Sequence, residues 1–207
     1  LEFRRVLFRS YAAEVAVTKD GVAVVGAFEG TVDFDPGPGV AERSASGGSH
    51  FVAMYSQDGE FLWVYTLPAE LEMQHYRFSP GLGVDRLGNV YFTSRYDNAR
   101  NGVDFAYGAG TDIRKGPGIF LSRINNNGTY AWTACMTQAL SSVVSRGSDV
   151  VIDRQGDAIV VGVFDGSIDF DPGPGTAMAT TGSYFESFVC KLRGADRSEK
   201  GTPAWWL

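Results

Sequence analysis

Short apolar runs separated by polar turns are the main pattern of this chain. Three of the runs are almost wholly apolar, and each follows a turn that contains a glycine: Val22–Phe28, Val90–Tyr96 and Ala158–Phe164. Runs of this length and composition, bounded by turn residues, predict β-strands that are buried on both faces. The chain is therefore predicted to be all-β.

Each of these runs belongs to a group of four predicted strands, of which it is the second. The predicted first strands are Glu14–Thr18, Leu82–Asp85 and Val150–Asp153, the third strands are Phe51–Tyr55, Ile119–Ile124 and Phe188–Leu192, and the fourth strands are Phe61–Thr66, Tyr130–Cys135 and Ala204–Leu207. Polar turns with glycine join neighbouring strands, which predicts antiparallel pairing.

The four-strand group repeats three times along the chain. The sequence from Asp33 to Gly39, DFDPGPG, recurs as Asp169 to Gly175, at twice the repeat length. The middle copy replaces this loop with Asn98–Gly110 and retains only the Val-Asp-Phe step that ends at Phe105. Three sets of landmarks give a period of about 68 residues, namely Gly21, Gly88 and Gly156, then Phe51, Phe120 and Phe188, then Trp63, Trp132 and Trp205.

Four antiparallel strands of fixed period are typical of a propeller blade. The sequence predicts a β-propeller-like array of three four-stranded antiparallel blades, with repeats at about 11–80, 81–148 and 149–207. Because propellers have about 4–8 blades, three would form an open, incomplete ring, completed by the remaining blades of a parent chain or by a partner. A β-solenoid has shorter coils, and a β-sandwich does not explain the repeat. The recurring tryptophans are expected to pack between blades, with sugar stacking as the alternative.

The first ten residues, LEFRRVLFRS, lack the repeat pattern and read like a translated sequencing adapter. We interpret residues 1–10 as a non-native scar, and residues 11–207 as the partial propeller of a longer protein. Leaving out their three arginines and one glutamate changes the formal net charge from −6 to −8. An acidic domain is a poor partner for nucleic acid. No apolar run approaches the roughly 20 residues of a spanning helix, so no membrane insertion is expected.

The repeat also resembles a known family. Residues Gly26–Phe34, the turn at Ile152–Ala158, and Phe51–Tyr55 followed by Asp58-Gly59 and Trp63 are similar to the bacterial β-propeller repeat family of the SBBP type. The resemblance covers nearly all of the chain after Ser10. It implies a propeller in a secreted or cell-surface bacterial protein, and no assigned catalytic residues. The middle copy departs from the pattern at Asn98–Gly110.

The DFDPGPG loops carry the candidate metal ligands. Asp33 and Asp35 in the first loop, like Asp169 and Asp171 in the third repeat, place two carboxylates on one side of a strand before a glycine turn. Such carboxylates are calcium ligands in other proteins, although calcium takes 6–8 oxygens and the spacing is not that of an EF-hand. The alternative is that the aspartates accept hydrogen bonds from loop amides. Beyond calcium, no cofactor is predicted.

Other reactive residues form no recognisable constellation. His50 and His75 are expected to be solvated loop residues, and Cys135 and Cys190 to be free, partly buried thiols. The chain has no HExxH or GxSxG sequence. The long connections 68–81 and 138–149 differ in composition and are interpreted as variable loops, where binding residues commonly lie.

These observations predict a scaffold that is not an enzyme. It would be secreted or on the cell surface and would present loops to a protein or glycan ligand. The alternative is a propeller-based glycan lyase or hydrolase that uses the paired aspartates as catalytic carboxyls about 5–10 Å apart. A calcium-stabilised structural repeat is a third interpretation, compatible with the first.

Overall fold

The computed structural model describes residues 10–67, 80–106, 108, 110–138, 145–182 and 184–194. These residues form β-strands and no helix, so the all-β prediction is confirmed. No helix in this part of the chain is long and apolar enough to cross a membrane. The strands are β1 (Ser10–Val17), β2 (Val22–Asp33), β3 (Glu42–Tyr55), β4 (Phe61–Thr66), β5 (Gly81–Val84), β6 (Val90–Asp104), β7 (Ile113–Ile124), β8 (Tyr130–Gln138), β9 (Arg146–Ile152), β10 (Ala158–Phe164), β11 (Ser167–Asp169), β12 (Met178–Thr180) and β13 (Glu186–Leu192).

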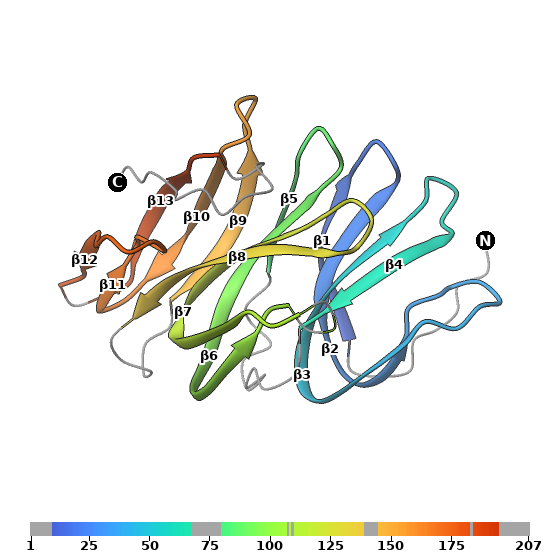
Figure 1. Ribbon diagram of the computed structural model, residues 1–207, viewed down its shortest axis with the longest axis horizontal. Coiled ribbons are helices and arrows are strands. Elements are labelled where there is room, and N and C mark those ends of the chain that lie inside the picture. The colour runs from blue at the N-terminus through green and yellow to red at the C-terminus, as the bar shows by residue number, and fades with distance from the viewer. Residues whose placement is uncertain are drawn as a thin grey trace.

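The strands form three antiparallel units that follow one another along the chain. Unit 1 (residues 10–67) is a meander in the order β1-β2-β3-β4, and unit 2 (residues 80–138) repeats it as β5-β6-β7-β8. Unit 3 (residues 145–194) holds β9-β10-β13 together with the hairpin β11–β12, whose strand β11 pairs with β8 of unit 2. Figure 1 shows unit 1 at the right, unit 3 at the left and unit 2 between them.

Each predicted strand that lies among the described residues overlaps an observed strand. The bounds of β4 and β10 are as predicted. The second and third strands of units 1 and 2 are longer than predicted, because β2 and β6 continue to the loop aspartates and their partner strands begin just after the loop. Unit 3 breaks this extension into the separate hairpin β11–β12, which the sequence did not predict. The predicted fourth strand of unit 3, Ala204–Leu207, lies outside the described residues.

One landmark of the repeat was aligned wrongly. A turn follows the first strand of each unit, and the residue directly after the strand donates its amide to a carbonyl: Thr18 to Gly21, Asp85 to Asn89, and Asp153 to Asp157. Gly21 therefore occupies the place of Asn89, and not that of Gly88 as the sequence suggested. The turn of unit 1 is one residue shorter, and Val22 is the residue that corresponds to Val90 and Ala158.

The side chains of each unit alternate between two faces. The front face of unit 1 carries Val24, Phe51 and Tyr55, and its back face carries Val25, Val52 and Met54, because successive residues of a strand point to opposite sides. Units 2 and 3 have matching strand registers: Val90 pairs with Ile124, and Ala158 with Leu192, as Val22 pairs with Tyr55 in unit 1. Equivalent residues therefore lie on the same faces in all three units.

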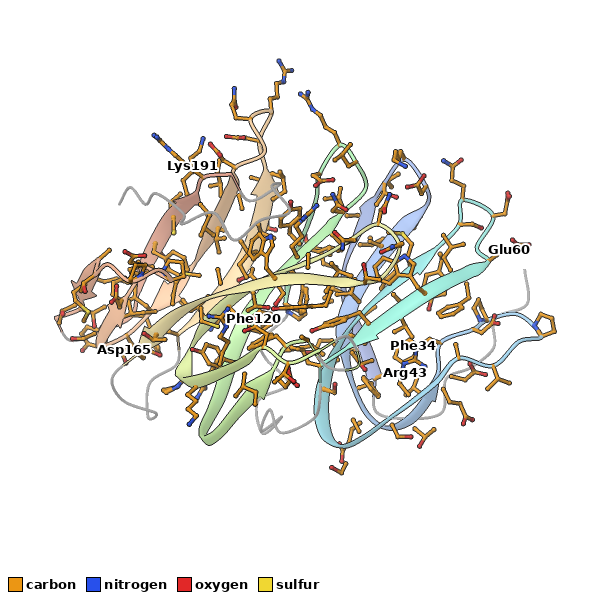
Figure 2. The ribbon with its side chains drawn as sticks, in the orientation of Figure 1. Phe34, Arg43, Glu60, Phe120, Asp165 and Lys191 are labelled. Carbon is orange, nitrogen blue, oxygen red and sulfur yellow. The ribbon has the colours of Figure 1, made fainter. Side chains whose placement is uncertain are left out.

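The hydrophobic core is a stack of these faces. One cluster joins the back of unit 1 to the front of unit 2, and it includes Val25 and Val52 together with Phe92 and Phe120. A second joins the back of unit 2, including Leu121, to the front of unit 3. A third cluster lies on the front of unit 1. Phe120 and Phe34, which Figure 2 labels, belong to the first and the third of these clusters.

Two tryptophans support the stack from the back faces. Trp63 packs against the cluster between units 1 and 2, and its indole N–H donates to the carbonyl of Asn126 in the β7–β8 turn at 2.9 Å. Trp132 packs against the cluster between units 2 and 3, edge to face with Tyr91. Both tryptophans therefore pack between units, as the sequence predicted; Trp205 lies outside the described residues.

The first strands of units 2 and 3 approach each other so closely that β5 needs glycine. A Cβ atom placed on Gly81 would lie 2.4 Å from the Cα of Asp149, and one placed on Gly83 would lie 2.5 Å from the carbonyl oxygen of Val150. These neighbours are backbone atoms of β9, which cannot move aside as a flexible side chain can. The two glycines therefore set the distance between β5 and β9.

We expect Gly81→Ala to destabilise the chain by about 1–3 kcal/mol, the usual cost of overpacking, measured by chemical or thermal unfolding. Gly47→Ala in β3 is the matched control, because nothing lies within 4 Å of a Cβ placed there. That variant should leave stability unchanged or raise it slightly. Equal stability of the two variants would contradict the close packing of β5 on β9.

Candidate functional site: the aspartate loops

The loop that follows β2 is organised by a single carboxylate oxygen. Oδ1 of Asp33 accepts the amide of Asp35 at 3.0 Å and the amide of Ala41 at 2.8 Å. The first bond is an Asx-turn, and the second spans the whole loop to the start of the next strand. The loop is thereby closed by the side chain of its first residue.

Unit 3 repeats this geometry atom for atom. Oδ1 of Asp169 accepts the amide of Asp171 at 3.0 Å and the amide of Ala177 at 2.8 Å. The loop there joins β11 to β12. The identical heptapeptides of the two loops therefore adopt the same hydrogen bonds.

Unit 2 keeps the same closure although its loop sequence differs. Oδ1 of Asp104 accepts the amides of Ala106 at 3.1 Å and of Asp112 at 2.8 Å. The loop closure thus requires the aspartate that ends the strand, and not the Pro-Gly-Pro-Gly sequence. All three loops share a short sequence, namely valine or isoleucine, then this aspartate, then phenylalanine.

The second aspartate of the DFDPGPG loops has a more local role. Oδ1 of Asp35 accepts the amide of Gly37 at 2.7 Å, and Oδ1 of Asp171 accepts the amide of Gly173 at the same distance. A Cβ on Gly39 would lie 2.1 Å from Oδ2 of Asp35. A side chain at the last glycine of the motif would therefore displace the carboxylate of Asp35.

The closed loop holds an aromatic residue in the core. The residue after the first aspartate is Phe34, Phe105 or Phe170, and all three are buried. Each ring lies against a phenylalanine of the third strand, with centroids 4.9 Å, 5.1 Å and 4.9 Å apart, and against an aromatic residue of the second strand. The strand partners are Phe51 and Phe28, Phe120 and Tyr96, and Phe188 and Phe164. The loop aspartates therefore fix the position of one ring in a three-ring cluster.

The loop of unit 2 contains a polar cluster that the other loops lack. Asp112 stands at the position of Ala41, and its carboxylate pairs with Nε of Arg114 at 2.7 Å and accepts the hydroxyl of Tyr130 at 2.5 Å. Burial, and then the bond to Asp112, raise the pKa of Tyr130. The cluster anchors the loop of unit 2 to its fourth strand.

The calcium prediction for Asp33, Asp35, Asp169 and Asp171 was not tested by these contacts, and it stays a prediction. Among the residues described, no group of three or more His, Cys, Asp or Glu side chains is arranged to hold a metal ion. If calcium does bind, the two carboxylates of each loop would hold it together with loop carbonyls. The alternative interpretation was that the aspartates accept hydrogen bonds from loop amides. The amide bonds to the Oδ1 atoms are of that kind.

Two acidic residues that the sequence analysis did not single out lie near each other on the first strands of units 1 and 3. Glu14 of β1 and Asp149 of β9 hold the same position in units 1 and 3, and Gly81 holds it in unit 2. Oε2 of Glu14 accepts the amide of Leu82 at 2.8 Å. Burial and the negative charge of Asp149 raise the pKa of Glu14. The sequence could have pointed to Glu14 and Asp149, because both hold the same position of the repeat.

The expectation of a solvated loop histidine was wrong for His50. This residue lies in β3, is buried between units 1 and 2, and has its ring 6.3 Å from that of Phe120. Burial lowers the pKa of His50 to about 4. Its Nδ1 has no hydrogen-bond partner in the part of the chain described. His75 lies outside the described residues, as do residues 68–79 and 139–144 of the two predicted loops, whereas residues 146–149 belong to β9.

The two cysteines are free and buried. Each belongs to a front face, Cys135 in unit 2 and Cys190 in unit 3, and burial raises the pKa of both thiols. They act as small apolar core residues.

A comparison of the chain with models of protein families finds no match, and a comparison with curated proteins finds none either.

We expect Asp169→Ala to destabilise the chain by about 2–3 kcal/mol, because two amides lose a charged acceptor. Asp171→Ala removes one such bond and should cost less. Asp169→Asn keeps an oxygen at the same position and should recover at least part of the loss. If hydrogen bonds account for these effects, the losses measured by thermal unfolding are equal with excess calcium and with a chelator. A loss confined to the calcium samples would support calcium binding at these loops instead.

We expect the stability of the chain to fall as the pH decreases from about 6.5 to about 4. His50 is uncharged in the folded protein down to about pH 4, whereas an unfolded histidine binds a proton below about pH 6.5. The unfolded state therefore binds more protons in this window, and the loss for this group is up to about 3 kcal/mol. His50→Asn removes this part of the dependence. Identical pH profiles of unfolding for both proteins would contradict a neutral, buried His50.

Proposed function

We propose that this chain is a β-propeller-type repeat scaffold in which each unit is one blade of an open ring. Its role is to hold loops on a rigid framework, where they bind a protein or glycan ligand. The single observation that carries the proposal is that two four-stranded meanders and a third unit, whose strands β9-β10-β13 follow the order of their first three strands, stack front to back through apolar clusters.

The arrangement of the first strands supports the blade interpretation. In a propeller the first strands of all blades lie around the axis. Here β1 contacts β5 through the Glu14 to Leu82 bond, and β5 contacts β9 through Gly81 and Gly83. The inner strands of consecutive units are therefore neighbours, as radiating blades require.

The use of the loop aspartates also favours a scaffold. Asp33, Asp104 and Asp169 repeat one set of amide bonds that fixes a core ring in each unit. Carboxylates that recur as copies of one structural element are explained by folding. The resemblance to the SBBP-type repeats is consistent with this, and with the proposal that the protein is secreted or on the surface of a bacterial cell.

A carbohydrate-active enzyme is the second candidate, and one observation favours it. Glu14 and Asp149 are two carboxylates on inner strands, and the charge of Asp149 helps to raise the pKa of Glu14. A carboxylic acid of raised pKa beside an ionised carboxylate is the arrangement that glycosidases use. The paired residues of this alternative are thus Glu14 and Asp149, rather than the loop aspartates.

Incubation of the purified chain with a panel of bacterial and plant polysaccharides separates the two candidates. For a scaffold we expect binding by calorimetry without release of reducing or unsaturated ends. Turnover that is lost in Glu14→Gln and in Asp149→Asn, while Asp165→Asn retains it, would support the enzyme. Asp165 is the matched control because it is an equally half-buried acid outside the inner strands.

A further inference from the structure

A buried arginine of unit 2 lacks an acceptor for its charged N–H groups. Arg123 of β7 is 5% exposed. Its Nε and Nη1 atoms are buried and have no hydrogen-bond partner in the part of the chain that the structure describes. None of the ion pairs formed by the described carboxylates involves Arg123. Burial of an unpaired charge is costly, so a folded protein that retains such a group is expected to supply it with an acceptor.

Arg123 faces the interface between units 2 and 3. It lies two residues after Leu121, and therefore on the same back face of unit 2. Its register partners on the neighbouring strands are Tyr91 of β6 and Trp132 of β8. The rings of these two residues meet edge to face with their centroids 6.2 Å apart, and both belong to the apolar cluster that joins unit 2 to unit 3. The aromatic rings and this interface account for the burial of Arg123.

The equivalent positions of the other two units are satisfied. The matching registers place Met54 of unit 1 and Lys191 of unit 3 at the position of Arg123. Met54 is apolar and 1% exposed. The Nζ atom of Lys191 pairs with Asp153 at 2.6 Å and with Asp157 at 3.0 Å. The repeat thus uses an apolar side chain here, or a cation with two acids, whereas Arg123 brings a charge without the acids.

A second donor next to Arg123 also lacks an acceptor. Trp63 pairs with Met54 in unit 1 as Trp132 pairs with Arg123 in unit 2. The indole N–H of Trp63 donates to the carbonyl of Asn126 at 2.9 Å. No residue among those described accepts the indole N–H of Trp132. Neighbouring residues on one sheet face therefore offer N–H donors without a protein acceptor.

We propose that Arg123 binds a small oxyanion, either phosphate or a carboxylate ion, in the interface between units 2 and 3. A guanidinium group carries five N–H donors in a planar fork, which suits the oxygens of such ions. The apolar surroundings strengthen these charge-assisted hydrogen bonds. The ligand is small because a side chain that is 5% exposed is closed to a polymer such as a glycan. The ion would neutralise the arginine and help to hold unit 3 on unit 2.

Thermal unfolding of the purified chain tests this proposal, in a cationic buffer at constant pH and ionic strength. We expect the melting temperature to rise by about 3 °C or more when phosphate or acetate replaces chloride, because an ion that binds only the folded chain stabilises it. The ion that gives the rise identifies the occupant. Isothermal titration with the same ion should show saturable binding. Absence of a rise and of saturable binding with both ions would overturn the proposal.

Substitution of Arg123 shows whether the ion binds there. Arg123→Met copies Met54 of unit 1, and it should lose the rise caused by the ion. In chloride it should melt at or above the temperature of the unchanged chain, because it removes an unpaired buried charge. Arg123→Gln is a second uncharged variant and should lose the rise as well. Arg86→Met is the matched control, because Arg86 is exposed in the turn after β5, and it should keep the rise.

Two further results would contradict binding at Arg123. One is an equal rise in the Arg123 variants and in the control, which would reflect the general stabilisation that excluded ions such as phosphate give to folded proteins. The other is a large loss of stability of Arg123→Met in chloride, because this would show that an acid of the chain already pairs with the arginine. Both leave the scaffold proposal standing, since that proposal fails on turnover of a polysaccharide.

Discussion

The burial of sheet faces against neighbouring sheets is the constraint on which the rest of this structure depends. A unit of three or four strands with apolar residues on both faces cannot remove those residues from water by itself. The back of unit 1 and the front of unit 2 solve this for each other, and so do the back of unit 2 and the front of unit 3. The glycines of β5, the tryptophans and the closed loops all support this stacking. Gly81 and Gly83 let β5 and β9 come together, and Trp63 and Trp132 fill the interfaces.

The aspartate loops connect local hydrogen bonding to this stack. A carboxylate that satisfies two buried or half-buried amides makes a loop with a fixed shape, since unpaired amides would be costly. The fixed loop then places a phenylalanine against the two other rings of its unit. Units 1 and 3 achieve this with an identical sequence. Unit 2 achieves it with Asp104 alone and adds the Asp112, Arg114 and Tyr130 cluster. The common feature is therefore a hydrogen-bond geometry, and a role in ligand binding is not needed to explain it.

Repeated acidic residues in a repeat protein invite a metal or catalytic interpretation, but here their recurrence follows from the recurrence of the fold. Residues that break the repeat are more informative. Glu14 and Asp149 stand at the position where unit 2 has Gly81. Chemistry is better sought at such departures.

The sequence by itself determined the strand class, the repeat and the residues of the loops. Those features are encoded locally, in apolar runs such as Ala158–Phe164, in turn residues and in the identical DFDPGPG strings. Sequence reasoning did not reveal that Gly21 corresponds to Asn89, that His50 is buried, or that β11 pairs with β8 of the preceding unit. Only the tertiary structure decided these points, and it also decided which of the two apolar faces of each strand meets which neighbour. The physical reason is that these features depend on contacts between residues far apart in the sequence, such as His50 with Phe120 and Ile168 with Gln138, and no local pattern of residues records those contacts.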